Sequence, residues 1–175
     1  VTIELASSCP ATGWVHMLWT AHMWLLALYP EETQAELWAN PNMLASSVVN
    51  ITGDVVPVGG GFRWTGRGFF SSGVDHCNWL TALTPIKREH SAEAPELRWL
   101  LLPREDIEIV GDWYTVGLKG AGSKSIVVKD AFIPERRTIL HTDADEGTTP
   151  GGQIHAHPMY RATATAMAAP ARGFL

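Results

Sequence analysis

The sequence GFFSSGVDHCNW at residues 68–79 brings two phenylalanine rings, two hydroxyls, a carboxylate, an imidazole and a thiol into one short run. Alternate side chains of an extended strand share a face, so Phe69 is predicted to lie beside Ser71. Phe70 then lies beside Ser72 on the opposite face. An aromatic ring next to a hydroxyl makes a flat apolar surface with one hydrogen-bonding group, which suits a planar heteroaromatic ring. Taken alone, the stretch fits a half-buried strand with a polar end better.

The triplet Asp75-His76-Cys77 contains the residue types of a thiol catalytic site. Neighbouring residues of an extended segment point to opposite faces, so these side chains cannot act together as nucleophile and base. We therefore expect a turn here, with Cys77 in the core.

His22 lies on the apolar face of a predicted helix, four residues after Leu18 and three before Leu25. A core histidine bonded to a backbone carbonyl is the usual meaning of such a position. The alternative is a histidine that lines an apolar pocket, where its near-neutral pKa lets it exchange protons with a substrate. The sequence leaves both interpretations open.

Other motifs predict no phosphate or metal site. The run GLKGAGSK at 117–124 resembles a phosphate-binding loop but has Ser and Lys in the wrong order, and a strand pattern follows it instead of a helix. The glycines at 59–61 precede a strand and are predicted to form a turn. His155 and His157, with two aspartates upstream, are interpreted as solvated loop residues, because nothing fixes their mutual geometry.

Composition excludes several classes of function. The 175-residue chain has a net charge of -5, so it lacks the basic surface that nucleic acids require. Two cysteines far apart in the chain fit a reducing compartment, and we expect a cytoplasmic protein. Residues 6–29 carry no charged side chain, but proline, glycine and histidines interrupt them, which favours a buried helix over a membrane span.

The periodicity of apolar residues predicts helices at 11–28 and 31–38. β-branched and aromatic runs between turn residues then predict a series of short strands. These strands are 44–49, 62–72, 79–85, 97–102, 107–110, 125–133 and 138–140. A Gly/Pro/Thr segment at 147–152 is predicted to be a linker, and the alanine-rich residues 160–175 to begin another helix.

The predicted fold class is α+β, with N-terminal helices, an antiparallel β-sandwich or barrel, and a truncated C-terminal helical domain. The chain opens without an initiator Met and closes without a finished element, so we expect it to be a fragment.

The order of four motifs resembles the middle part of the acyl-CoA dehydrogenase superfamily. They are GRGFFSSG at 66–73, WLLLP at 99–103, WYTVGLKGAGS at 113–123 and FIP at 132–134. The first is similar to the strand that packs against the flavin, with Phe69 where the family usually has Trp and Ser71 where it has Thr or Ser. The resemblance implies the end of an N-terminal helical domain at 1–43, a flavin-binding β domain at 44–142, and a linker with the start of a helical bundle at 143–175.

Within the superfamily, the sequence resembles the flavin-dependent monooxygenases more than the dehydrogenases. SSVVNI at 46–51 does not match the Glu-Pro-Gly-rich flavin loop of dehydrogenases. FSSGVDHCNW at 70–79 is similar to the oxygenase components of two-component aromatic and steroid-phenol hydroxylases, as are Trp14-Val15 and the Ala21-His22-x-Trp24 pattern on the preceding helix.

This resemblance implies hydroxylation of a small aromatic or phenolic substrate by O2 and a reduced flavin, FMN or FAD, supplied by a separate reductase. It implies a homotetramer when the chain is complete. Phe69, Phe70, Ser71 and Ser72 would form the flavin wall. His22 would help to deprotonate the phenol, and Ser71 or Ser72 would donate a hydrogen bond near the reacting part of the flavin.

Two alternatives remain at this point. One is acyl-CoA dehydrogenation, whose catalytic carboxylate would come from the helical bundle. The other is a non-catalytic domain used for association.

Overall fold

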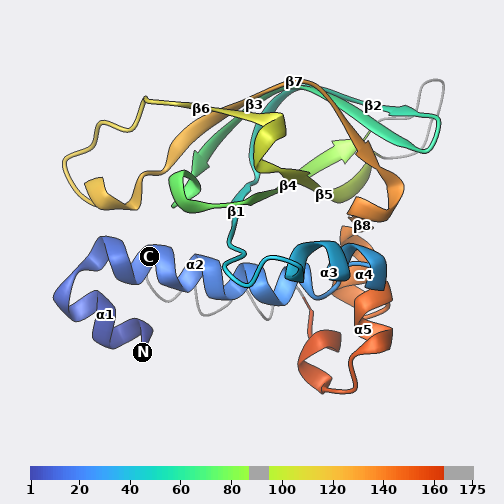
Figure 1. The fold of residues 1–175 in the computed structure, drawn as a ribbon, viewed down its shortest axis with the longest axis horizontal. Helices are drawn as coiled ribbons and strands as arrows, with labels where there is room; N and C mark the ends of the chain where they lie inside the picture. The colour runs from blue at the N-terminus through green and yellow to red at the C-terminus, as the bar shows by residue number, and fades with distance from the viewer. Residues whose placement is uncertain (87–94, 164–175) are drawn as a thin grey trace.

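The computed structural model describes residues 1–86 and 95–163, which form a layer of helices beneath a two-sheet β-sandwich (Figure 1). The helices are α1 (Thr2–Ser8), α2 (Pro10–Leu26), α3 (Glu31–Trp38), α4 (His141–Glu146) and α5 (Pro150–Ile154). The predictions of helices at 11–28 and 31–38 are confirmed, except that the first helix ends at Leu26. Among the described residues, none of the helices has the length and apolar character needed to cross a membrane.

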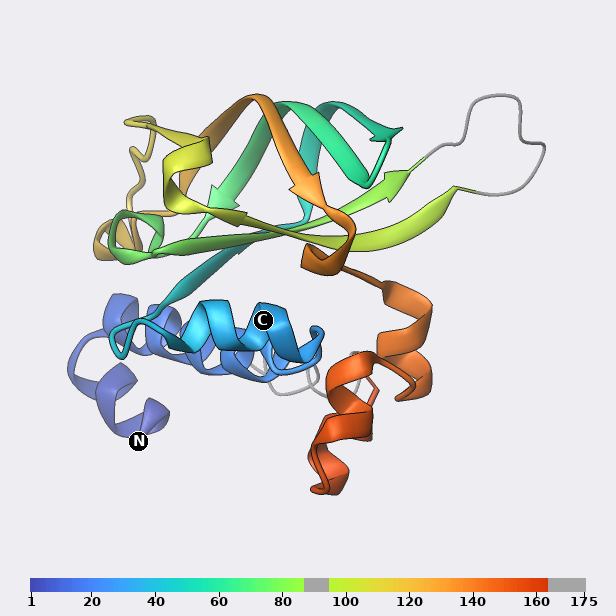
Figure 2. The same ribbon diagram turned by 45° about the vertical axis from the view of Figure 1, so that its right-hand side comes forward.

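Helix α2 is the long helix of the lower layer. Pro10 occupies its first turn, where a missing N–H costs nothing. Helix α1 folds back onto it at Gly13, where a Cβ would lie 2.5 Å from the Cβ of Ala6. Only glycine allows the two helices to approach so closely. The turn Ala27–Tyr29 and Pro30 then lead into α3, which lies beside α2 beneath the sandwich (Figure 2).

The sandwich has two four-stranded sheets. One has the order β1-β4-β5-β8 and the other β2-β3-β7-β6. The strands are β1 (Ala45–Val48), β2 (Asn50–Val58), β3 (Gly61–Ser71), β4 (Trp79–Ile86), β5 (Glu96–Pro103), β6 (Ile107–Val110), β7 (Lys124–Pro134) and β8 (Thr138–Leu140). The prediction of a sandwich is confirmed.

The sheet β1-β4-β5-β8 is covered on both faces, which gives the molecule three layers. Leu100 and Leu102 of β5 pack with Trp64 and Ile126 of the other sheet. Leu101, between them in sequence, packs on the opposite face against residues of the helical layer. A strand buried on both faces has no polar alternation, which explains the continuous apolar run from Trp99 to Pro103 in β5.

Four sequence predictions need correction. Strand β1 pairs with β4 in parallel, and not in the predicted antiparallel sense. Strand β2 was missed because Gly53 and Pro57 interrupt it and it is largely exposed, so no apolar alternation marks it. The prediction of a linker at 147–152 is wrong from Pro150 onward, because Pro150–Ile154 is helical. The Thr149 hydroxyl caps this helix by accepting a hydrogen bond from Gly152 N at 3.2 Å.

The fourth correction concerns the predicted C-terminal helix. Its first residues belong to a 3₁₀ turn, Pro158–Arg161, and residues 164–175 lie outside the described part of the chain.

Candidate functional site

The end of β3 contains a β-bulge at the two phenylalanines. Gly68 pairs with Ile126 and Ser71 with Lys124, so two residues of β3 lie opposite the single residue Ser125 of β7. Phe70 adopts a left-handed backbone conformation, with φ of 61°. Its side chain is 64% exposed, whereas Ser71 is fully buried. The bulge breaks the alternation that predicted Phe69 beside Ser71 and Phe70 beside Ser72, and it turns the Phe70 ring outward.

The hydroxyls of Ser71 and Ser72 lie in a buried hydrogen-bond network. Ser46 Oγ donates to Ser72 O at 2.9 Å and lies 2.7 Å from Ser71 Oγ. A hydroxyl has one proton, so Ser71 donates to Ser46. Ser72 Oγ accepts from Trp14 Nε1 at 3.1 Å and lies 2.7 Å from Ser123 Oγ. In this arrangement the Ser71 proton is already used inside the protein.

The surface that the bulge offers to a ligand is aromatic and has a cation beside it. The guanidinium of Arg67 lies 5.2 Å from the centre of the partly buried Phe69 ring and pairs with Asp112 at 2.6 Å. Arg67 Nε is buried and has no hydrogen-bond partner among the described residues. A flavin combines a planar ring system with a phosphate, so the Phe69 ring with a guanidinium beside it, followed in sequence by the exposed Phe70, fits one side of such a molecule.

His22 is buried and also lines a groove, so both sequence interpretations describe it. Its Nδ1 lies 2.7 Å from Ala45 O. A carbonyl only accepts, so Nδ1 carries the proton in the neutral ring and Nε2 keeps its lone pair. Burial lowers the pKa of His22, only partly offset by the bond to Ala45. The groove has a volume of about 940 Å³, and its walls include Trp24, Trp99 and Tyr160. A neutral imidazole in an apolar groove can accept a proton from a bound phenol.

Strand β1 connects the two candidate groups. Ala45 bonds His22, and the next residue, Ser46, bonds Ser71. Sequence reasoning missed Ser46, whose contacts depend on the tertiary fold. It also missed the network roles of Trp14 and Ser123, although both lie in motifs that carried the resemblance.

The remaining sequence candidates have structural partners. Val74–His76 is a 3₁₀ turn, as predicted, and Cys77 is buried, with a pKa raised by burial to about 12. Asp75 pairs with Lys124 at 2.8 Å. The ring of His155 bonds the Gln34 side chain at 3.0 Å. In the part of the chain that the structure describes, no three His, Cys, Asp or Glu side chains are grouped to hold a metal ion.

Curated proteins that are similar to the chain include hydroxylases and flavin-dependent monooxygenases. It is 38% identical over 157 residues to a pigment production hydroxylase of a Rhodococcus species, covering 89% of this chain and 40% of the relative. It is 38% identical over 161 residues to the oxygenase component of an FADH(2)-dependent resorcinol hydroxylase of a Rhizobium species, covering 88% and 38%. No protein-family model matches the chain.

Solved structures of such oxygenases share the fold. The HsaA monooxygenase from Mycobacterium tuberculosis matches with a TM-score of 0.89 and 35% identity, over 95% of this chain and 43% of that one. XiaF from a Streptomyces species, in complex with FADH2 and glycerol, matches with a TM-score of 0.79 and 26% identity, over 95% and 42%. The chain spans about 40% of the length of its curated relatives.

Proposed function

We propose that this chain belongs to the flavin-dependent oxygenase components, to which it is similar over nearly its whole length. It would form part of an enzyme that hydroxylates an aromatic or phenolic substrate. The observation that carries the proposal is the similarity to hydroxylases and monooxygenases over 88–91% of the chain. The proposal includes the division of the chain into residues 1–43, 44–142 and 143–175, although the last boundary falls inside α4.

Residues of the bulge would hold the flavin. The exposed Phe70 ring and the adjoining Phe69 would cover one face of the flavin ring, and Arg67 supplies positive charge beside them. When bound and reduced, the flavin would activate O2 for transfer of one oxygen atom to the substrate. The choice between FMN and FAD stays open in this proposal.

The serines would then act in two ways. Ser72 supports the bulge from within, through its bonds to Trp14 and Ser123. Ser71 lies one residue from Phe70, and its hydroxyl would reach a ligand only by giving up its bond to Ser46. A donor next to a group that gains negative charge lowers the barrier of that step.

His22 would serve as the base for the substrate. Its Nδ1 is held by Ala45 O, so Nε2 is the nitrogen that would take the phenolic proton. Loss of that proton makes the ring more electron-rich and more reactive toward an electrophilic oxygen atom. The apolar walls of the groove would exclude water, which preserves the activated oxygen for the substrate.

The proposal extends to partners and location. The relative from Rhizobium is named as an oxygenase component, which supports a separate reductase as the source of reduced flavin for this protein. A homotetrameric assembly and a cytoplasmic location belong to the same proposal. The two free cysteines are consistent with that location.

The test uses the product of the complete reading frame that contains this chain. The protein is mixed with anaerobically reduced FMN or FAD, and then with O2 and a panel of phenols. Hydroxylated product supports the proposal. Reduction of bound oxidised flavin by an acyl-CoA would instead indicate a dehydrogenase, and a protein that retains no flavin would favour a non-catalytic association domain.

A further inference from the structure

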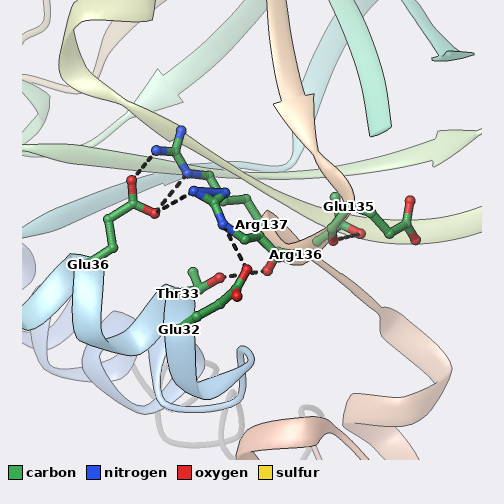
Figure 3. Close-up of polar contacts among 7 residues, drawn as sticks. Glu32, Thr33, Glu36, Glu135, Arg136 and Arg137 are labelled. Carbon is green, nitrogen blue, oxygen red and sulfur yellow. Dashed lines mark hydrogen bonds and ion pairs between the residues drawn. The ribbon is translucent and has the colours of Figure 1, made fainter. Parts of the chain in front are cut away.

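An ionic cluster joins helix α3 to the 3₁₀ turn Glu135–Arg137, which lies between β7 and β8 (Figure 3). Arg137 makes two bonds to the Glu36 carboxylate, through Nε at 3.1 Å and through Nη2. Arg136 pairs with Glu32 at 2.8 Å. The hydroxyl of Thr33 donates to the Arg136 carbonyl at 2.7 Å. The cluster therefore fastens the helical layer to the sandwich.

The two arginines have different surroundings. The Arg136 side chain is 38% exposed, whereas that of Arg137 is 16% exposed. The Arg137 guanidinium also lies 5.0 Å from the centre of the Trp79 ring. A planar guanidinium stacked on an indole and bonded twice to a carboxylate is held in one orientation. Arg137 therefore contacts Trp79 as well as α3.

Trp79 begins β4 and lies beside the strand that carries the His22 contact. Ala45 is its partner in the parallel β1–β4 pair. The Trp79 amide donates to Leu44 O at 3.2 Å, and the amide of Asn78 donates to the same oxygen at 2.9 Å. Asn78 Oδ1 accepts from Leu44 N at 3.1 Å. The start of β1 is therefore set by residues 78 and 79.

The next carbonyl along the chain is that of Ala45, the first residue of β1, which accepts the proton of His22 Nδ1 at 2.7 Å. Because this bond occupies Nδ1, Nε2 is the ring nitrogen that stays free for a substrate. A continuous set of contacts thus runs from Glu36 through Arg137, Trp79 and β1 to His22.

We propose that Arg137 is a positioning residue that, through Trp79 and β1, holds the Ala45 carbonyl where it orients the His22 ring. The significance of this role for hydroxylation rests on the proposed function of His22, but the structural coupling itself does not. A plain surface ion pair would contribute little to stability and would leave the His22 ring unaffected.

The test is hydrogen exchange at the carbon between the two ring nitrogens of histidine, measured by mass spectrometry of peptides from the folded protein. This exchange is slow for a buried, fixed ring and needs neither flavin nor substrate. In Arg137→Ala, the His22 exchange rate should rise roughly tenfold as the ring gains access to water. His16, half-buried on the same helix, serves as the internal reference and should not change.

Arg136→Ala is the matched control. It removes the ion pairs of Arg136 with Glu32 and Glu36 but keeps Arg137 with its bonds to Glu36 and its contact to the Trp79 ring, so His22 should exchange as in the wild type. Arg137→Lys, which keeps the charge, should restore part of the protection. If Arg137→Ala does not fold, Arg137→Gln takes its place with the same expectation. Equal His22 exchange rates in the Arg137 and Arg136 variants would overturn the proposal. Loss of hydroxylation in His22→Gln, measured separately, tests the proposed function.

Discussion

The buried serine network predicts different losses of stability for the same substitution at two adjacent positions, Ser71→Ala and Ser72→Ala. Ser72→Ala removes the acceptor of Trp14 Nε1 and the partner of Ser123 Oγ. Ser71→Ala removes one partner of Ser46, which keeps its bond to Ser72 O. The two variants lose the same atom type from neighbouring buried positions and serve as controls for each other.

The structure gives the expected magnitudes. A buried polar group that loses its partner costs about 1–3 kcal/mol. Ser72→Ala leaves two such groups, one of them only partly buried, so we expect a loss of about 2–4 kcal/mol in the free energy of unfolding. Ser71→Ala breaks one bond and leaves Ser46 paired, so we expect about 1 kcal/mol. The melting temperature should fall by about 5–12 °C in the first variant and about 2–4 °C in the second.

Urea unfolding followed by tryptophan fluorescence measures these losses, and the chain has eight tryptophans as reporters. A double-mutant cycle of Ser72→Ala with Trp14→Phe should give a coupling energy of about 1 kcal/mol, because the two residues share a hydrogen bond. Equal destabilisation by both serine variants, together with an additive cycle, would refute the network as described.

Three further predictions concern backbone geometry and charge. Gly151→Ala should destabilise the protein strongly, since its Cβ would lie 1.9 Å from Ala27 O, whereas Gly59→Ala, with nothing within 4 Å, should leave the melting temperature unchanged. Phe70→Gly should not lower the melting temperature, because it relieves a left-handed φ of 61°, yet in the complete protein the affinity for reduced flavin should fall roughly tenfold. Because burial lowers the pKa of His22 in the folded protein, the imidazole takes up its proton at a higher pH in the unfolded chain than in the folded one. Wild-type stability should therefore fall as the pH drops below about 6.5. In His22→Gln the urea midpoint should depend less on pH over that range, and an unchanged dependence would contradict the assignment.

Local patterns in the sequence were sufficient to predict most of the elements. Strands 107–110 and 138–140 have the predicted bounds, because each is a short apolar run between turn residues. Strand β2 escaped because exposure removes the alternation by which a strand is recognised. The parallel β1–β4 pair depends on a contact between distant segments, which no local pattern encodes.

The candidate site was predictable in composition but not in geometry. Phe69 to Ser72 were recognised by residue type, yet the bulge that buries Ser71 and exposes Phe70 arises from pairing with β7. His22 could be placed on an apolar helix face, but its bond to Ala45 depends on how β1 crosses the helix. The role of Ser46 had no sequence signal at all, since its partners lie more than twenty residues away.

The central proposal is that the complete protein transfers one oxygen atom from O2 to an aromatic ring. The most direct measurement is a single turnover of the complete protein with reduced flavin, a phenolic substrate and 18O2, in the absence of any nicotinamide. Our account predicts a hydroxylated product that carries one 18O atom. A product whose added oxygen comes from water, or rapid oxidation of bound flavin without hydroxylation of any phenol tested, would contradict it.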